Sequence, residues 1–239
     1  MRTAERISTW IRERVEEAGA RGVVLGISGG IDSSLTAVLA KMGLGDGVLG
    51  VIMPCHNSPT GEEHARMLAA KFGIETEYVD LTPTFDGLLA TLPPGARLAV
   101  ANLKPRLRMA VLYYYANSRN YLVAGTGNKT ELAIGYFTKY GDGGADILPL
   151  GSLLKRQVRE LSRELGIPEE IIVKPPSADL WEGQTDEGEM GISYDELDNI
   201  LAAIESGDTG ACDQEALARV RAMIAVSQHK RELIPICEL

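Results

Sequence analysis

Residues 23–34 constrain this chain more than any other stretch of its sequence. Residues 23–27 are apolar apart from one glycine, two adjacent glycines follow, and apolar residues recur at helical spacing from Leu35 onwards. The pattern predicts a buried strand that turns directly into a helix. The first amide groups of such a helix lack intrahelical partners, and the helix dipole adds positive charge, so the turn predicts an anion site suited to phosphate.

The side chains around this turn add a metal ion to the prediction. Adjacent glycines let the backbone approach a ligand closely, and serine hydroxyls supply further donors. The Asp32 carboxylate would repel phosphate unless a cation lay between them, which favours a magnesium–pyrophosphate site. The candidate ligand-binding residues of this segment are Gly26, Ser28, Gly29, Gly30, Ile31, Asp32, Ser33 and Ser34.

Three other interpretations of the turn fit its residues less well or stay open. No Gly-Lys-Ser/Thr follows the glycines, which argues against a Walker A loop. The spacing of Gly26, Gly29 and Gly30 does not fit the G-x-G-x-x-G pattern of dinucleotide-binding folds. The remaining alternative is a glycine-rich turn that binds no ligand.

Strands and helices alternate along the first half of the chain. Strands are predicted at 48–53, 75–79 and 121–124, and helices at 4–18, 33–42, 61–72 and 96–118. This alternation favours a parallel sheet covered by helices on both faces, with ligands at the carboxyl ends of its strands. We therefore expect one Rossmann-like three-layer α/β/α domain over residues 1–239, with a helix at 152–165 and a C-terminal helical segment at 193–205 and 214–227.

A polar stretch at 174–191 separates the last two groups of elements. It carries two adjacent prolines and a run of glycines and acidic residues, and it reads as too polar to pack against a core. We interpret it as a mobile loop. Residues 183–190 are expected to act as a lid that orders over bound substrates and excludes water from a reactive intermediate.

Composition excludes several classes of protein. The net charge of −9 argues against a non-specific nucleic-acid binder, which is usually basic. The three cysteines, Cys55, Cys212 and Cys237, are scattered without the spacing of a zinc site or a disulfide framework. No apolar run approaches membrane-spanning length, and the N-terminus reads as an amphipathic helix rather than a signal peptide. We therefore expect a cytoplasmic enzyme with no membrane or nucleic-acid partner.

A second acidic residue follows the fourth predicted strand. Glu131 comes just after the glycine-rich turn at 125–128, and it would meet Asp32 over one pocket if the first and fourth strands are neighbours. Two carboxylates together with phosphate oxygens form an oxygen-ligand set suited to Mg²⁺. The alternative is an acidic residue in the first turn of a helix, where the helix dipole favours it.

These residues carry a resemblance to known enzymes. The run 28–33 resembles the signature of the ATP pyrophosphatase (PP-loop) superfamily, which cleaves ATP between its α and β phosphates. Within it, the chain is similar to the NAD synthetases over nearly its whole length. The matching runs are 125–131, 135–150, 154–158, 176–180, 191–195 and 229–231, and the stretch 137–149 is the most specific.

The resemblance implies a reaction in two steps. ATP adenylates the nicotinate carboxylate of deamido-NAD and releases pyrophosphate, and ammonia then displaces AMP to give NAD. It also implies Mg²⁺ as cofactor and a homodimer, with the apolar helix around 96–118 as the contact. Glutamine-dependent relatives carry an additional amide-hydrolysing domain for which 239 residues leave no room. Free ammonia is therefore the expected nitrogen source, unless a separate glutaminase delivers it.

The resemblance also implies roles for individual residues. The catalytic residues would be Asp32, Lys139, Asp142 and Lys155, and the metal ligands Asp32 and Glu131. Besides the glycine turn, ATP would contact Thr126, Lys155 and Ser177. Deamido-NAD would contact Asn102, Arg106, Lys139, Asp142, Asp146, Glu189, His229 and Lys230. Asp142 would position ammonia near the acyl carbon.

Two positions depart from the family pattern, and two other functions stay open. Met53 stands where many relatives carry an arginine, and Leu98 where an aromatic residue often stacks on the pyridine ring. The rival enzyme is another adenylating ligase of the superfamily, such as the synthetase half of a GMP synthetase. A nucleotide sensor without turnover is the alternative from a different class.

Overall fold

Four parallel strands form the sheet of the computed structural model, which describes residues 2–57, 59–181 and 183–238. The strands are β1 (Val23–Gly26), β2 (Val48–Ile52), β3 (Glu75–Tyr78) and β4 (Leu122–Val123), in the spatial order β3-β2-β1-β4. In the sheet, Val23 of β1 lies opposite Val48 on one side and Leu122 on the other. The predicted parallel sheet is thus confirmed, and β1 and β4 are neighbours.

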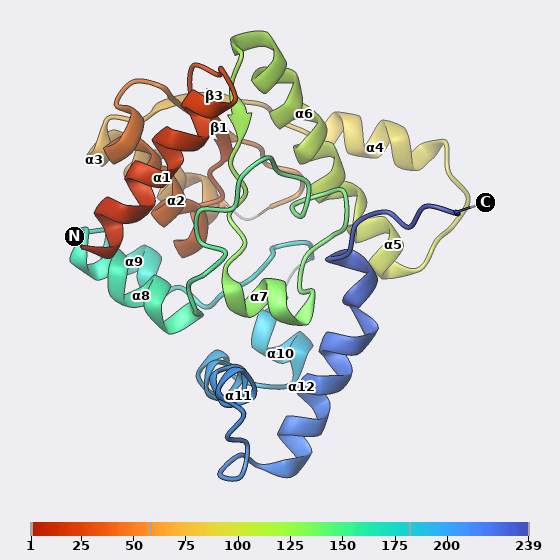
Figure 1. The fold of residues 1–239 in the computed structure, drawn as a ribbon. Coiled ribbons are helices and arrows are strands. Elements are labelled where there is room, and N and C mark those ends of the chain that lie inside the picture. Colours follow the sequence, from red (N-terminus) through yellow and green to blue (C-terminus); the bar gives the residue numbers. More distant parts are fainter. Residues whose placement is uncertain (1, 58, 182, 239) are drawn as a thin grey trace.

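Helices cover both faces of this sheet, as predicted (Figure 1). Side chains that alternate along β1 explain how: Val23 and Leu25 belong to one apolar cluster, and Val24 belongs to another. The first cluster includes residues of α1 (Thr3–Glu17), α2 (Ile31–Leu44), α3 (Pro59–Phe72), α8 (Lys155–Glu164) and α9 (Glu169–Ile172). The second includes residues of α4 (Thr82–Ala90), α5 (Arg97–Ala101) and α6 (Leu103–Arg119).

The predicted single helix at 96–118 is wrong, because the chain breaks it at Asn102. Asn102 ends α5 and precedes α6. A proline inside a helix clashes with the carbonyl four residues earlier, and Pro105 would meet that of Ala101 in a continuous helix. The break places Pro105 in the first turn of α6, where proline is tolerated. The fourth strand is also shorter than predicted, since Ala124 makes only a single bridge to Ile147.

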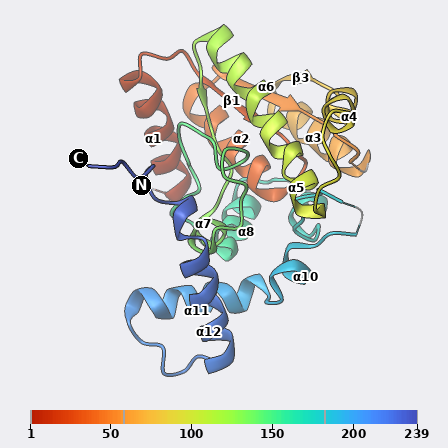
Figure 2. The same cartoon turned by 90° about the vertical axis from the view of Figure 1, so that its right-hand side faces the viewer.

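The C-terminal helices form a third apolar cluster away from the sheet. It joins α7 (Lys129–Ile134), α10 (Asp186–Met190), α11 (Tyr194–Ser206) and α12 (Gln214–Val226). In Figure 2, α11 and α12 project below the sheet and the helices that cover it. The predicted helices at 193–205 and 214–227 are confirmed.

The stretch at 174–191 is not too polar to pack, so that prediction is wrong. It contains α10, whose Asp186 and Met190 side chains are both buried. The carboxylate tolerates burial because tyrosine hydroxyls and the amide of Ala178 lie within hydrogen-bond distance of it. The expectation that residues 183–190 order over substrates stays a prediction.

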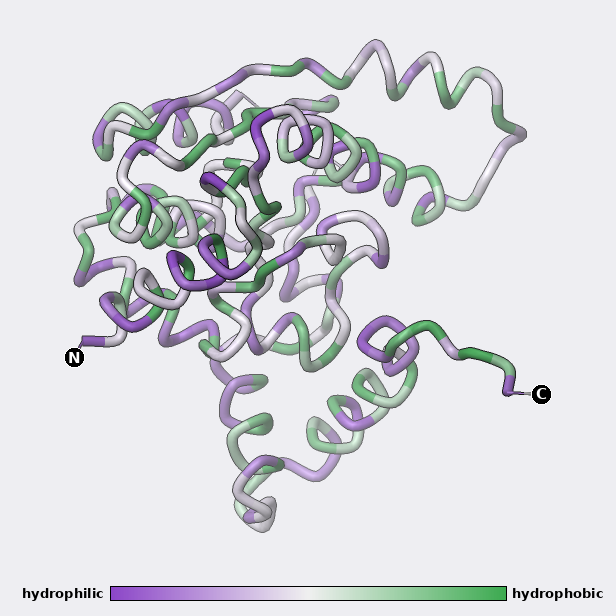
Figure 3. The backbone as a smooth tube through the Cα atoms, turned by 45° about the horizontal axis from the view of Figure 1, so that its top comes forward, coloured by the Kyte–Doolittle hydropathy of each residue, from purple (hydrophilic) through white to green (hydrophobic). Residues whose placement is uncertain are grey.

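The chain ends in a short 3-10 turn and an extended tail. The turn η1 (Gln228–Lys230) follows α12, and residues 231–238 are exposed, including the apolar Leu233, Ile234 and Ile236. Figure 3 shows this tail as a green, hydrophobic run beside the C-terminus. Among the residues that the structure describes, none of the helices is long and apolar enough to cross a membrane.

Candidate active site

A cavity of about 560 Å³ opens at the carboxyl ends of β1, β2 and β4. This is within the usual range of small-molecule sites, and it lies where ligands bind in parallel α/β sheets. Most predicted site residues line it: Gly26, Ser28, Gly30, Ile31, Asp32, Ser33, Asn102, Arg106, Thr126, Glu131, Lys139, Asp142, Lys155, Ser177, Glu189, His229 and Lys230.

The glycine turn after β1 is held by its own short-range hydrogen bonds. Ser33 Oγ accepts from the Ser28 amide at 3.2 Å and donates to the Gly30 carbonyl at 3.0 Å. The Gly30 amide donates to Ser28 Oγ at 3.2 Å. Gly29 has a φ of +73°, and a Cβ there would lie 2.1 Å from the Gly61 carbonyl oxygen. The turn is therefore preformed, and only glycine fits at position 29.

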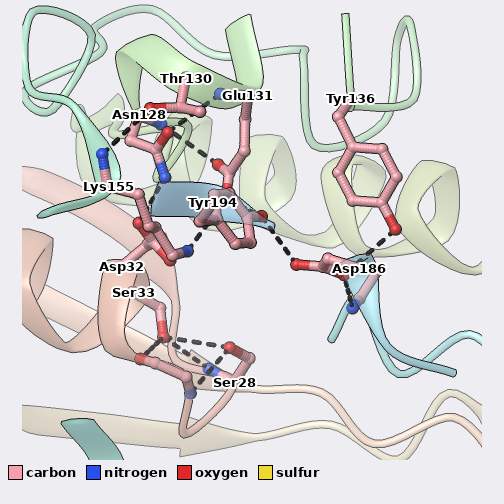
Figure 4. A network of polar contacts seen from close by, with 12 residues as sticks. Ser28, Asp32, Ser33, Asn128, Thr130, Glu131, Tyr136, Lys155, Asp186 and Tyr194 are labelled. Atoms are coloured by element: carbon pink, nitrogen blue, oxygen red, sulfur yellow. Dashed lines mark hydrogen bonds and ion pairs between the residues drawn. The ribbon is translucent and has the colours of Figure 1, made fainter. Parts of the chain in front are cut away.

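Three charged side chains meet beside this turn (Figure 4). The Lys155 ammonium group lies 2.5 Å from Asp32 Oδ2 and 3.1 Å from Glu131 Oε1. Lys155 is the first residue of α8, Asp32 belongs to the first turn of α2, and Glu131 to that of α7. The Lys155 side chain is 1% exposed, whereas those of Asp32 and Glu131 are 16% and 15% exposed and border the cavity.

Electrostatics keep this lysine charged. Desolvation disfavours the buried ammonium group, but Asp32 and Glu131 outweigh it and raise the pKa of Lys155. Desolvation also raises the pKa of the Glu131 carboxyl, against the opposing effect of Lys155. The cluster is thus a buried cation between two carboxylates, which is stable only as long as its partners remain together.

The same two carboxylates fit a divalent metal ion. Carboxylate oxygens are the ligands that Mg²⁺ prefers, and each carboxylate has about four lone-pair sites, so the bonds to Lys155 leave capacity for a metal ion. Within the described part of the chain, no group of three or more His, Cys, Asp or Glu side chains is placed to hold a metal. A metal at Asp32 and Glu131 would therefore need further oxygen ligands from phosphate or water.

Glu131 also plays the structural role that the sequence left open. Its Oε2 atom accepts from the Asn128 amide at 3.3 Å, and its own amide donates to Asn128 Oδ1 at 3.0 Å. This reciprocal pair caps α7. Asn128 Nδ2 in turn donates to Asp32 Oδ1 at 2.8 Å. The cap therefore also orients the two carboxylates relative to each other.

Polar contacts continue from Glu131 to the segment around α10. The Tyr194 hydroxyl lies 3.2 Å from Glu131 Oε1 and 2.9 Å from Asp186 Oδ2. The Tyr136 hydroxyl lies 3.1 Å from Asp186 Oδ1 and 2.8 Å from Glu189 Oε2. Figure 4 shows Tyr194 between the charged cluster and Asp186. Neither Tyr194 nor Asp186 was predicted in the site, since Tyr194 has the spacing of a core residue and Asp186 lies in a polar stretch predicted to be a loop.

The opposite wall of the cavity is built from the loop at 135–144 and η1. Lys139 Nζ donates to the His229 carbonyl at 2.6 Å, and Lys230 Nζ donates to the carbonyls of Gly135 and Phe137 at 2.8 Å. These contacts bring residues some 90 positions apart in the sequence to one wall.

Asp142 and Asn102 are anchored to the same loop. Both bond to Thr138. The Thr138 amide donates to Asp142 Oδ1 at 2.9 Å, and the Thr138 hydroxyl donates to Asn102 Oδ1 at 2.8 Å. Desolvation raises the pKa of Asp142, against the effect of its hydrogen bonds and of Lys230. The break between α5 and α6 is what turns Asn102 towards this loop.

Three predicted site residues do not line the cavity. Gly29 packs against Gly61 of α3. Ser34 is fully buried in α2, because the helical turn of about 100° per residue carries it away from the face of Asp32. Asp146 accepts from the Val123 amide at 2.7 Å and the Tyr113 hydroxyl at 3.0 Å, so it anchors the end of β4 instead.

A polar group at the carboxyl end of β2 was not predicted from the sequence. Arg108 donates to the Met53 carbonyl at 3.2 Å and to Asn57 Oδ1 at 2.8 Å, and Asn57 Nδ2 donates to Asp179 Oδ2 at 2.6 Å. All four residues line the cavity, as does Leu98. From the sequence alone, Arg108 is expected to be a solvent-exposed charge on a helix. Only the fold shows that its side of the helix faces the cavity.

Comparisons with known proteins show to which family the chain belongs. Residues 3–234 match the NAD synthase family. The chain is 48% identical over 234 residues to the NH(3)-dependent NAD(+) synthetase of Carboxydothermus hydrogenoformans, a match that covers 96% of this chain and 94% of that one.

Two solved structures share the fold over nearly all of their length. The NMN synthetase from Francisella tularensis has a TM-score of 0.92 and 39% identity, covering 99% of this chain and 98% of that one. The NH3-dependent NAD synthetase from Campylobacter jejuni has a TM-score of 0.87 and 31% identity, with the same coverage. The chain therefore belongs to the NAD synthase family.

Proposed function

We propose that this chain uses ATP and ammonia to convert deamido-NAD into NAD, with AMP and pyrophosphate as the other products. The observation that carries the proposal is the Asp32–Lys155–Glu131 cluster beside a preformed anion-binding turn. Curated relatives with the name NH(3)-dependent NAD(+) synthetase support it at 46–53% identity.

In the first step a carboxylate oxygen of deamido-NAD attacks the α-phosphorus of ATP. The bond between the α-phosphorus and its bridging oxygen breaks, and pyrophosphate leaves with the electron pair. Free amides of the glycine turn and the Lys155 ammonium group would stabilise the negative charge on the departing group. Mg²⁺ held by Asp32 and Glu131 would supply further positive charge there. Thr126 and Ser177, which line the same cavity, would contact ATP.

In the second step ammonia attacks the acyl carbon of the adenylate, and AMP leaves with the acyl oxygen. A proton is released as the amide forms. We assign the nicotinate half of the substrate to the wall that carries Asn102, Arg106, Lys139 and Asp142. The Asp142 carboxylate would hold ammonia and accept its proton. Glu189, His229 and Lys230 complete this wall, whereas Asp146 has no place in it.

A homodimer is the second part of the proposal. Four apolar residues of the helix expected at the contact, Leu107, Val111, Leu112 and Tyr115, are partly buried against the sheet within one chain. Tyr114 on the same helix is 68% exposed and supports a contact through the outer face of α6. Analytical ultracentrifugation of Tyr114→Glu against wild type would test this: we expect a dimer for wild type and a shift towards monomer for the variant.

Formation of NMN from the corresponding mononucleotide acid is a second candidate function. One observation favours it: the structural similarity to an NMN synthetase reaches a TM-score of 0.92. Both candidates use the same chemistry at the same carboxylate. They differ only in whether the second nucleotide of the substrate is needed for binding.

Product analysis decides between these functions. Purified protein is incubated with ATP, Mg²⁺ and ammonium, with deamido-NAD in one reaction and the mononucleotide acid in another. A higher kcat/KM for deamido-NAD supports the proposal, and a higher value for the mononucleotide favours NMN formation. ATP cleavage to AMP without formation of NAD or NMN would mean that the enzyme acts on another carboxylate substrate. No turnover of ATP would favour a sensor.

Replacing ammonium by glutamine tests the source of nitrogen. We expect no amide product from glutamine with the isolated chain. If a glutaminase partner exists, adding it should restore product formation from glutamine. Asp32→Asn serves as the control, since it should abolish ATP cleavage with either nitrogen source.

A further inference from the structure

Helix α8 begins at Lys155, and its own Gln157 side chain accepts only from the amide of the preceding residue, at 2.8 Å. The residue before it is Leu154, whose aliphatic side chain accepts no hydrogen bond. The first free amides of the helix are instead satisfied by other elements. The Lys155 amide donates to Thr130 Oγ1 at 3.0 Å, and the Arg156 amide donates to Asp198 Oδ2 at 2.9 Å. The start of α8 is therefore capped by side chains of α7 and α11.

These two capping side chains are bonded to each other. Thr130 Oγ1 donates to Asp198 Oδ1 at 2.6 Å, and both residues are fully buried. A buried carboxylate is costly unless its oxygens are satisfied. Here a hydroxyl and an amide at the positive end of a helix satisfy both oxygens of Asp198. The group is compact and complete, and it makes no contact with the cavity.

The capping group lies directly behind the charged cluster. Thr130 is followed by Glu131, and the amide that it accepts from belongs to Lys155 itself. The backbone of both charged residues is thus fixed at one point (Figure 4). The Lys155 side chain is 1% exposed and bonds to both Asp32 and Glu131, so a shift of its backbone would change the distances to both carboxylates.

We propose that Asp198, acting through Thr130, is a positioning residue that sets the place of the Lys155 ammonium group between Asp32 and Glu131. The inference rests on the proposed function, in which Lys155 stabilises the phosphates of ATP. Displacement of a catalytic group by about 1 Å can lower the rate about 100-fold, even when the substituted residue lies away from the reacting atoms.

The test compares two substitutions at one position. Thr130→Val keeps the shape of the side chain and removes the hydroxyl, whereas Thr130→Ser keeps the hydroxyl. We expect Thr130→Val to lower kcat for amide formation about 10- to 100-fold with the KM for ATP within about 3-fold, and Thr130→Ser to stay within about 3-fold of wild type. Asp198→Asn should resemble Thr130→Val. Folded fractions are checked by thermal unfolding at the assay temperature.

A matched control lies on the same pair of helices. Asp195 of α11 contacts Arg159 of α8 at 2.8 Å, but its side chain is 77% exposed. Asp195→Asn also removes a contact between α11 and α8 and should leave kcat unchanged. Equal losses for Asp195→Asn and Thr130→Val would mean that any weakening of this helix pair lowers the rate, and would overturn the proposal.

A double-mutant cycle separates positioning from general destabilisation. In a Lys155→Ala background, Thr130→Val should cause no further loss of pyrophosphate release, because its effect passes through the missing ammonium group. Losses that multiply would overturn the proposal.

A crystal structure of Thr130→Val gives a readout that needs no activity. We expect the Lys155 ammonium group to leave hydrogen-bond distance of Asp32, and an unmoved ammonium group would refute the inference. If wild type forms no amide, the proposed function fails, and this structure still decides the positioning role.

Discussion

The two sides of the nucleotide site are held together by different forces. On the glycine-turn side, the hydrogen bonds join residues within five positions of each other and involve only neutral serine and backbone groups. On the side of the charged cluster, next to the turn, the bond between Lys155 and Asp32 spans 123 positions and joins opposite charges. One side therefore depends on backbone geometry, and the other on charge balance between elements that are distant in sequence.

This difference predicts two kinds of failure. A substitution that distorts the turn should change the local backbone and leave the charges paired. A substitution that removes one charge of the cluster leaves its buried partners unpaired, which is the more costly event in a low-dielectric interior. Substitutions on the two sides therefore test this contrast.

Lys155→Met should be the most damaging substitution in the site. It removes the cation between Asp32 and Glu131, whose side chains are only 16% and 15% exposed. Loss of one partner of a buried charge pair typically costs about 3–5 kcal/mol. We expect a loss of that size in the free energy of unfolding, measured with urea at pH 8, and at least a 100-fold loss of ATP-dependent turnover.

Lys129→Met is the control for this substitution. Lys129 precedes Thr130 in α7 and contacts Glu205 at 2.6 Å, but Glu205 is 67% exposed. Exposed ion pairs contribute little, so the loss should be about 0.5 kcal/mol or less. Similar losses for both variants would show that burial of the cluster does not decide its contribution.

Gly29→Ala should be the most damaging change on the turn side. A side chain at a φ of +73° costs about 1–2 kcal/mol, and contact with the Gly61 carbonyl oxygen adds typically 1–3 kcal/mol. Gly30→Ala is the matched variant, since Gly30 has a φ of −91° and its nearest contact would be Ser28 Oγ at 3.3 Å. We expect Gly29→Ala to lower the unfolding midpoint clearly and Gly30→Ala to lower mainly ATP affinity. Equal midpoints would contradict this.

The same contrast explains what could be predicted from sequence. The turn was predictable because strand, glycines, serines and helix lie next to one another, and local geometry alone defines the anion site. The meeting of Asp32 with Glu131 needed one further assumption, the adjacency of β1 and β4, which the sheet order confirms. Asp146 does not line the cavity, because its motif gives its neighbours but not its bond to the Val123 amide.

The remaining parts of the network have no local signal. Tyr194 lies in a helix with the apolar spacing of a core residue, and Asp186 lies in a run of glycines and acids. Nothing near either residue shows that their side chains meet. Long-range polar pairs of this kind depend on how helices pack in space. A hydrophobic pattern predicts which face of a helix is buried, but not which atoms of two helices meet.

Tyr194→Phe should have an intermediate effect on the charged side. It keeps the ring and removes a hydroxyl within 3.2 Å of Glu131 and 2.9 Å of Asp186. We expect a loss of about 1–2 kcal/mol in the free energy of unfolding. The kcat for pyrophosphate release should fall about 10-fold. This is less than the loss of about 100-fold that displacement of a catalytic group by about 1 Å can cause, because Lys155 and Asn128 still hold Glu131.

Tyr136→Phe is the comparison for Tyr194→Phe. Its hydroxyl contacts Asp186 and Glu189 but not Glu131. It should therefore affect the KM for the pyridine substrate more than the rate of ATP cleavage. If both variants lower ATP cleavage equally, direct contact with Glu131 is not what matters.

The smallest expected effect is a pH dependence that arises from Asp186. Desolvation raises the pKa of this buried carboxyl, although hydrogen bonds from Tyr194 and Tyr136 oppose the shift. The folded state then holds the proton more tightly than the unfolded state, so this contribution to stability is complete at low pH and is lost as pH rises through the folded pKa. Asp186→Asn removes the titration. The free energy of unfolding of wild type relative to Asp186→Asn should therefore fall as pH rises from 4 towards the folded pKa, with a slope of at most about 1.4 kcal/mol per pH unit. If the free energies of unfolding of the two proteins change in parallel with pH, the hydrogen bonds from Tyr194 and Tyr136 fully offset the effect of burial on the pKa of Asp186.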